Sequence, residues 1–161
     1  MQKISFDDGR VRLDINGNGI LAFNPSDFNV YERFYALIKE LPELEKQYAS
    51  EVEIPDENTQ DEQAAVVELA GRELIRAKEI DALIKSKLSH VFGAENDFNQ
   101  LLGGVNLMAF GKNDERIITN FLNAILPYIE NGIAKHTGNE VAAAYANREQ
   151  RRAAQNKGVK K

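Results

Sequence analysis

The chain contains no cysteine. This absence excludes disulfides, thiolate metal sites and cysteine nucleophiles, and it fits a reducing compartment. Histidine is also scarce, since His90 and His136 are the only two, and neither has a second histidine or a cysteine three or four positions away. We expect both histidines near helix C-termini, where the helix dipole favours a protonated imidazole. They are therefore predicted to have structural roles, and no metal site is expected.

Long apolar runs are missing as well. No stretch approaches the ~20 consecutive apolar residues that a transmembrane helix needs. The first ten residues, MQKISFDDGR, contain no apolar segment of the signal-peptide kind. We therefore expect no contact with membranes and predict a cytoplasmic protein.

Recognisable catalytic motifs are absent too. The sequence contains neither G-x-S-x-G nor H-E-x-x-H, the motifs of serine hydrolases and of zinc proteases. Its carboxylates fall at expected surface positions, and no pair of them is flanked by an apolar pocket that the sequence reveals. The prediction is a protein that is not an enzyme and has no cofactor.

Two stretches resemble ligand loops without completing them. DINGNG, residues 14–19, has the oxygen-bearing side chains and the glycine of the first half of a calcium loop, but position 12 of that loop is Pro25 instead of glutamate. GVNLMAFGKN has six residues between Gly104 and Gly111 where a phosphate-binding loop has four, and Asn113 replaces its Ser or Thr. We interpret DINGNG as a hairpin turn, because Asn-Gly is a strong turn signal.

Alternating apolar residues predict three short strands in the first 23 residues, at 3–6, 11–15 and 20–23, forming a small antiparallel β-meander. Helical spacing dominates the remainder. Helices are predicted from Pro25, capped by Asn24, to Tyr48, from Asp61 to Phe92, around Asp97–Leu102, and from about Ile117 to a stop at Gly138. The expected fold is mostly α, with a single α-rich domain over residues 1–138.

Charge divides the chain unequally. Residues 148–161 carry a net charge of +5, which leaves −10 on the first 147 residues. Acidic residues concentrate in a predicted solvated linker at 50–62, and the basic C-terminal tail, 139–161, is predicted to be helical to about Ala154 and disordered beyond it. The acidic body of one copy and the basic tail of another are complementary in a head-to-tail sense, so a homo-oligomer is one expectation.

Two groups of residues are candidates for partner binding. The first is an aromatic stripe on the first predicted helix, Tyr31, Phe34 and Tyr35, for which the alternative is ordinary core packing. The second comprises Arg148, Arg151 and Arg152 of the tail, for which the alternative is a solubilising end. No aromatic residue follows Tyr145, so RNA is a poorer candidate than an acidic protein surface.

The order of these parts resembles the tail assembly chaperones of long-tailed bacteriophages and related prophages. The resemblance covers nearly the whole chain and includes the segment YANREQRR, residues 145–152. It implies a protein that binds the long, aggregation-prone tape measure protein in the host cytoplasm and is displaced when the tube protein polymerises. It also implies a longer form made by frameshifting near Lys157 or Lys160–Lys161, which is a further candidate partner.

Two other classes remain open. One is a structural or scaffolding protein of the virion, which mature particles would retain. The other is a small phage regulatory or inhibitory protein that binds a host factor.

Overall fold

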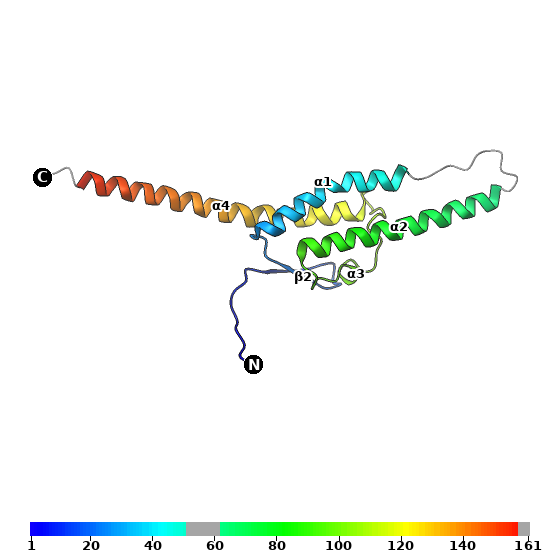
Figure 1. The fold of residues 1–161 in the computed structure, drawn as a ribbon, viewed down its shortest axis with the longest axis horizontal. Coiled ribbons are helices and arrows are strands. Elements are labelled where there is room, and N and C mark those ends of the chain that lie inside the picture. Colours follow the sequence, from blue (N-terminus) through cyan, green and yellow to red (C-terminus); the bar gives the residue numbers. More distant parts are fainter. Residues whose placement is uncertain (51–61, 158–161) are drawn as a thin grey trace.

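A computed structural model describes the backbone of residues 1–50 and 62–157, and the side chains of residues 1–48 and 63–138. The elements follow the order β1 (Val11–Asp14), β2 (Ile20–Phe23), α1 (Phe28–Ser50), α2 (Glu62–Phe92), α3 (Phe98–Leu101) and α4 (Ile117–Lys157). Figure 1 shows α1, α2 and α4 running alongside one another, with the strands and α3 beside the C-terminal half of α2, on the side away from α1. The predicted mostly helical fold with an antiparallel N-terminal sheet is confirmed. The predicted acidic linker lies almost entirely outside the described residues.

The strands form an antiparallel hairpin in which Val11 is opposite Phe23 and Asp14 is opposite Ile20. DINGNG is the turn between them, as predicted: Asn16 and Gly17 have positive φ angles of 54° and 76°. The Asp14 carboxylate accepts a hydrogen bond from the Gly17 N–H at 2.8 Å. The Asp14 carboxylate, which suggested a calcium ligand, therefore stabilises the turn.

The predicted strand at residues 3–6 is not formed, and residues 1–10 are exposed and belong to neither a sheet nor a helix. Figure 1 shows this N-terminal arm leaving the body. Its base is fixed by the Asn24 side-chain amide, which donates to the Asp8 carbonyl at 3.0 Å, and by an ion pair of 2.8 Å between Arg10 and Glu95. The sheet thus has two strands instead of the expected three, because the alternating segment has no strand edge beside it in this conformation.

The first helix begins three residues later than predicted. Asn24 caps a turn instead, since its carbonyl accepts from the Asp27 N–H and its side chain accepts from the Ser26 N–H. Asp27 is the helix cap: its carboxylate accepts from the Asn29 N–H at 2.9 Å, and its carbonyl accepts from the Tyr31 N–H at 3.0 Å. The prediction placed the cap one turn too early because Asn-Pro-Ser-Asp offers two capping side chains.

One aromatic ring connects most of the elements. Phe92, the last residue of α2, makes ring contacts with centroid separations of 5.0 to 6.4 Å to the rings of Phe23, Phe34, Phe98 and Phe121. Those four rings come from β2, α1, α3 and α4. Three of these contacts are edge-on and the contact with Phe98 is tilted. Ring contacts of this kind add to the stabilisation from apolar burial, so the core is centred where α2 ends.

The long helices α2 and α4 both extend beyond the core. Apolar residues of α2 are buried only in its second half, beginning at Ile84, whereas Val66 and Leu74 are exposed. The fourth helix was expected to stop at Gly138, but α4 continues through it to Lys157. Gly138 does not adopt the positive φ of a helix-ending glycine, and Figure 1 shows α4 extending past the body.

Candidate protein-binding surfaces

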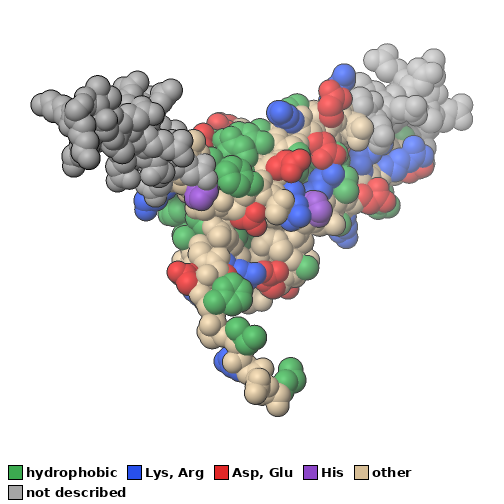
Figure 2. Space-filling model, turned by 60° about the vertical axis from the view of Figure 1, so that its left-hand side comes forward, with side chains coloured by type: hydrophobic (Ala, Val, Ile, Leu, Met, Phe, Trp, Pro, Cys, Tyr) green, Lys and Arg blue, Asp and Glu red, His purple; other side chains and the backbone are tan. Residues whose placement is uncertain are grey.

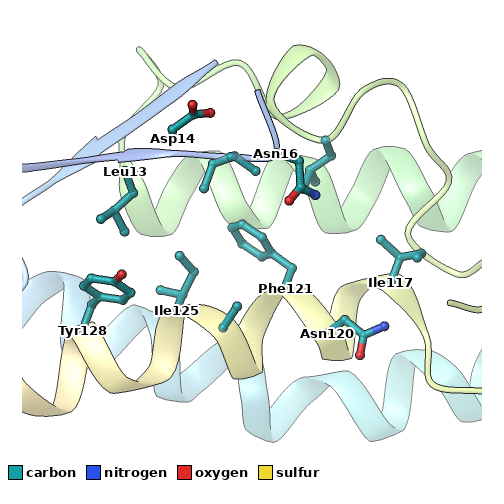
Figure 3. Close-up of a pocket in the computed structure, with 11 residues that line it drawn as sticks. Leu13, Asp14, Asn16, Ile117, Asn120, Phe121, Ile125 and Tyr128 are labelled. Carbon is teal, nitrogen blue, oxygen red and sulfur yellow. The ribbon is translucent and has the colours of Figure 1, made fainter. Parts of the chain in front are cut away.

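A groove of about 490 Å³ lies between the hairpin and α4 (Figure 3). Its strand side is formed by Leu13 and Ile15, which share a face because side chains alternate along a strand. Its helix side is formed by residues spaced three or four apart: Ile117, Phe121, Ile125 and Tyr128. In Figure 3 Leu13 points toward α4, whereas Asp14 points away from it. The floor of the groove is therefore apolar.

Two polar side chains at the rim of the groove, those of Asn120 and Asp14, are already engaged. Asn120 and Asn113 exchange two side-chain amide hydrogen bonds of 2.8 and 3.1 Å, and Asp14 closes its own turn. Within the described side chains, no group of three or more acidic or histidine residues could hold a metal ion. The groove therefore suits an apolar side chain or segment better than a charged or metal-bound ligand.

A second apolar surface lies on the first half of α2. Val66, Val67, Leu74 and Ile75, here called the α2 stripe, are between 61% and 72% exposed. They occupy one broad side of the helix, because residues seven or eight positions apart lie near one another on a helix surface. Figure 1 shows this half of α2 extending beyond the end of α1. No described element of the chain covers these side chains.

The sequence did not reveal the α2 stripe as a separate feature. Its residues have the same helical spacing as the buried residues further along the helix, so periodicity alone does not distinguish the exposed half from the buried half. One weak sequence signal distinguishes the two halves of the helix. Only the first half contains Gly71 and two adjacent valines, and these residues form helices less readily than Leu or Ala. Burial depends on a neighbouring element, which periodicity does not report.

The predicted aromatic stripe divides between core and surface. Phe34 is fully buried, so it is unavailable to a partner while this core is intact. Tyr31 and Tyr35 are half-buried, with their ring centroids 4.7 Å apart. The Tyr35 hydroxyl donates to the Glu130 carboxylate of α4 at 3.3 Å. Burial, followed by the nearby Glu130 charge, raises the pKa of Tyr35 above 10.0. These tyrosines therefore present a partly open aromatic surface on α1, which Tyr35 connects to α4 through Glu130.

The histidines differ in their positions along the helices. His90 lies in the last turn of α2, as predicted, and its carbonyl accepts a hydrogen bond of 3.3 Å from Arg33. His136 lies inside α4 instead of near its end, because α4 continues through Gly138. The His136 ring meets the exposed ring of Phe28 edge-on, with centroids 5.9 Å apart. The His90 contact is made by its backbone, whereas the His136 contact is made by its ring.

The tail residues Arg148, Arg151 and Arg152 lie on the helical backbone of α4 beyond Gly138, outside the described side chains. The structure therefore locates these residues along α4 without bringing them to the other candidate surfaces. Across the described helices, none has a long enough apolar stretch to cross a bilayer. A search of protein-family models, of curated proteins and of solved structures finds no match to this chain.

Proposed function

We propose that this protein is an assembly chaperone of a long-tailed phage or prophage, which binds the tape measure protein and keeps it soluble in the host cytoplasm during tail assembly. The α2 stripe carries the proposal. It presents four large aliphatic side chains on a helix half that no described element covers. An amphipathic helix of a partner recognises such a face by placing its own apolar residues against it.

The charge distribution supports this role. A net charge of −10 over residues 1–147 keeps a protein with open apolar surfaces in solution. A chaperone needs both properties, because it must expose apolar contacts without aggregating itself. The proposed binding mode involves no chemical step and no cofactor.

Tyr31 and Tyr35 are proposed as a second partner contact. Both rings are partly accessible, and tyrosine combines a large apolar ring with a hydroxyl that tolerates water. Arg148, Arg151 and Arg152 are proposed to contact an acidic segment of the partner, since α4 projects them away from the acidic body along the helix axis (Figure 1).

Co-expression tests the proposal. The chain is expressed with the long helical protein encoded beside it, and the soluble fraction of that protein is measured with and without the chaperone. Val67→Ser/Leu74→Ser removes two exposed members of the α2 stripe, and Ile20→Ser is the matched control because Ile20 is an exposed aliphatic residue on β2. We expect the wild type and the control to raise the soluble fraction, and the double variant to lose most of that effect.

The co-expression experiment tests chaperone function and the role of the α2 stripe separately. A long helical protein whose solubility is unchanged by the wild-type chain contradicts chaperone function. A double variant that works as well as the wild type removes the α2 stripe as the binding surface. Recovery of the chain from purified mature particles favours the virion structural alternative, in which the protein is retained after assembly.

Self-association through the tail is a separate part of the proposal. The positive tail and the negative body of another copy attract each other, and salt screens such exposed charges. An oligomer of this kind dissociates in high salt or after truncation following Asn147. An oligomer that survives both treatments is held together elsewhere.

A further inference from the structure

The two outer edges of the hairpin differ. On β2, the Ala22 N–H donates to the Asn96 side-chain oxygen at 3.0 Å, and the Ala22 carbonyl accepts from the Asn96 amide at 3.2 Å. The N–H and C=O of a strand residue point to the same side. The backbone of Ala22 therefore points away from β1, and Asn96 covers this edge as a neighbouring strand would.

The outer edge of β1 is open. Because Ala22 points away from β1, its partner Arg12 must point its own N–H and C=O away from β2. Along a strand, backbone groups point alternately toward and away from the partner strand. The hydrogen bond from the Ile15 N–H to the Gly19 carbonyl, at 2.9 Å, agrees with this alternation. Arg12 and Asp14 thus direct their backbone groups to the outer edge, where no described residue bonds them. Exposed edges of this kind readily accept a further strand.

The groove continues the inner face of the sheet beyond this edge. Leu13 lines the groove from β1, and Ile125 and Tyr128 line it from α4 (Figure 3). A strand added to β1 would therefore direct its inward side chains into an apolar space of about 490 Å³. The open edge would supply backbone hydrogen bonds, and the groove would select the side chains.

The N-terminal arm has the complementary sequence. Ile4 and Phe6 are 87% and 81% exposed, and Figure 2 shows hydrophobic side chains along the arm as it stands away from the body. In one antiparallel register, Ile4 is opposite Leu13 and Phe6 is opposite Val11, so both apolar side chains enter the groove face. The outward residues then pair by charge, with Lys3 opposite Asp14 and Asp7 opposite Arg10.

The base of the arm favours a second copy over the arm's own β1. Closing the arm onto its own strand in this register requires a two-residue turn at Asp8–Gly9. Asp-Gly is a favoured sequence for such a turn, but the favoured form has positive φ at both residues. Only Gly9 has it, and the Asp8 carbonyl is bonded to Asn24. The same register is symmetric about Asp8–Gly9, so two copies related by a two-fold axis satisfy it reciprocally, and neither chain has to fold back on itself at Asp8–Gly9.

We infer that two copies of this chain exchange their N-terminal arms, each arm pairing through Lys3–Phe6 with the open edge of the other copy's β1 and filling its groove with Ile4 and Phe6. The inference does not depend on the proposed chaperone function, because it uses neither the α2 stripe nor the basic tail.

Sedimentation velocity measures the association, with Ile4→Ser/Phe6→Ser as the test variant. Both side chains are exposed in the single copy, so the substitutions should leave helix content and thermal stability of the monomer unchanged. We expect a wild-type dimer whose dissociation constant rises at least about a hundredfold in the variant, because two large apolar side chains no longer fill the groove. Truncation after Asn147 should leave this dimer intact, which distinguishes it from association through the tail.

Disulfide trapping measures the register in a chain that has no native cysteine. Ser5 and Arg12 are opposite each other on the outward face and both are exposed, so Ser5→Cys/Arg12→Cys should oxidise to a covalent dimer. Ile4→Cys/Arg12→Cys is the control, because a one-residue shift points the two thiols to opposite faces. Either of two sedimentation results overturns the inference: a wild type that is monomeric at micromolar concentration, or a dimer whose affinity the serine variant does not change. Either of two trapping results also overturns it: a disulfide formed within one monomer, or equally efficient trapping in the control.

Discussion

The side chain of Asn96 holds the backbone of Ala22 by two hydrogen bonds, accepting from its N–H at 3.0 Å and donating to its carbonyl at 3.2 Å. The same amide also donates to the Phe92 carbonyl at 2.8 Å, where α2 ends. Asn96 is buried. The Asn96 side chain thus forms hydrogen bonds with backbone groups at the edge of β2 and at the C-terminus of α2, and it joins the hairpin to the helical layer.

Replacing Asn96 with alanine should destabilise the fold by about 2–3 kcal/mol. The substitution removes the partners of a buried carbonyl of Phe92 and of two part-buried backbone groups of Ala22. Each unsatisfied buried group costs about 1–3 kcal/mol. Urea unfolding measures the loss. Asn99→Ala is the control: the Asn99 side chain is exposed, so its removal should change stability by less than about 0.5 kcal/mol. Equal effects from the two variants would contradict the role assigned to Asn96.

The ion pair between Lys85 and Asp81 is predicted to be worth far more than a surface pair. Its side chains are 8% and 16% exposed, with the charged atoms 2.7 Å apart. Lys85 also donates to the Val105 carbonyl, and Asp81 accepts from the Leu107 N–H. Asp81→Ala leaves the ammonium buried with one carbonyl, so we expect a loss of about 3 kcal/mol in urea unfolding.

A matched control for this pair lies on the same helix. Arg72 and Glu68 have the same four-residue spacing and a distance of 2.6 Å, but their side chains are 66% and 67% exposed. Glu68→Ala should cost no more than about 0.5 kcal/mol. A loss from Asp81→Ala as small as that from Glu68→Ala would show that water reaches the Lys85 ammonium freely.

Short-range sequence signals predicted the turn and the helices, whereas the pairing of strands depended on tertiary contacts. The turn at Asn16–Gly17 and the helical spacing around Ile125 and Phe121 are local signals, and each was predicted from the sequence correctly. Residues 3–6 alternate as a strand should, but a strand exists only beside an available edge. Sequence therefore predicted what this segment can form without predicting where it finds a partner.

The burial of individual side chains was the property of the candidate surfaces that the sequence predicted least well. Phe34 and Tyr35 are adjacent in sequence, yet one is fully buried and the other is half-buried. The difference depends on Phe92 and on Glu130, which come from helices far away in the chain. A spacing argument places all three aromatic residues of the stripe together, and only the packed helices separate them.

Gly132 is predicted to be intolerant of even a methyl group. A Cβ atom there would overlap the Pro25 carbonyl, lying 2.6 Å from its carbon. The Ser26 hydroxyl donates to the Gly132 carbonyl at 3.1 Å, which fixes the close approach of this turn to α4. Gly132→Ala should therefore cost about 1–3 kcal/mol in urea unfolding, although alanine usually favours a helix. An unchanged or higher stability would show that the turn can move away.

Gly138→Ala should have the opposite effect. Gly138 lies inside α4, lacks a positive φ, and has no atom within 4 Å of the position of an added Cβ. Alanine in a helix interior gains about 0.5–1 kcal/mol over glycine. Since this part of α4 lies beyond the body, hydrogen exchange is the measurement, and amide protection around Gly138 should rise about two- to fivefold. A fall in protection would instead indicate a helix that ends at Gly138 with a positive φ.

The contact between Tyr35 and Glu130 predicts a loss of stability at alkaline pH. Burial and the Glu130 charge raise the pKa of Tyr35 above the 10.0 of an exposed tyrosine, so the folded state favours the neutral phenol. This contribution to stability is fully present below pH 10.0 and is lost as the pH rises through the folded-state pKa. Tyr35→Phe should therefore show a smaller decline in stability above pH 10.0 than the wild type.

Ultraviolet absorbance of tyrosinate, compared between the wild type and Tyr35→Phe, isolates the titration of Tyr35 itself. Glu130→Gln removes the second cause and keeps the size of the side chain, so the pKa of Tyr35 should move down toward its ordinary value while remaining above it, because burial persists. A pKa that is unchanged in Glu130→Gln would assign the whole shift to burial. A Tyr35 that titrates at or below the ordinary value in the wild type would mean that the phenol is open to water and that α1 and α4 do not enclose it.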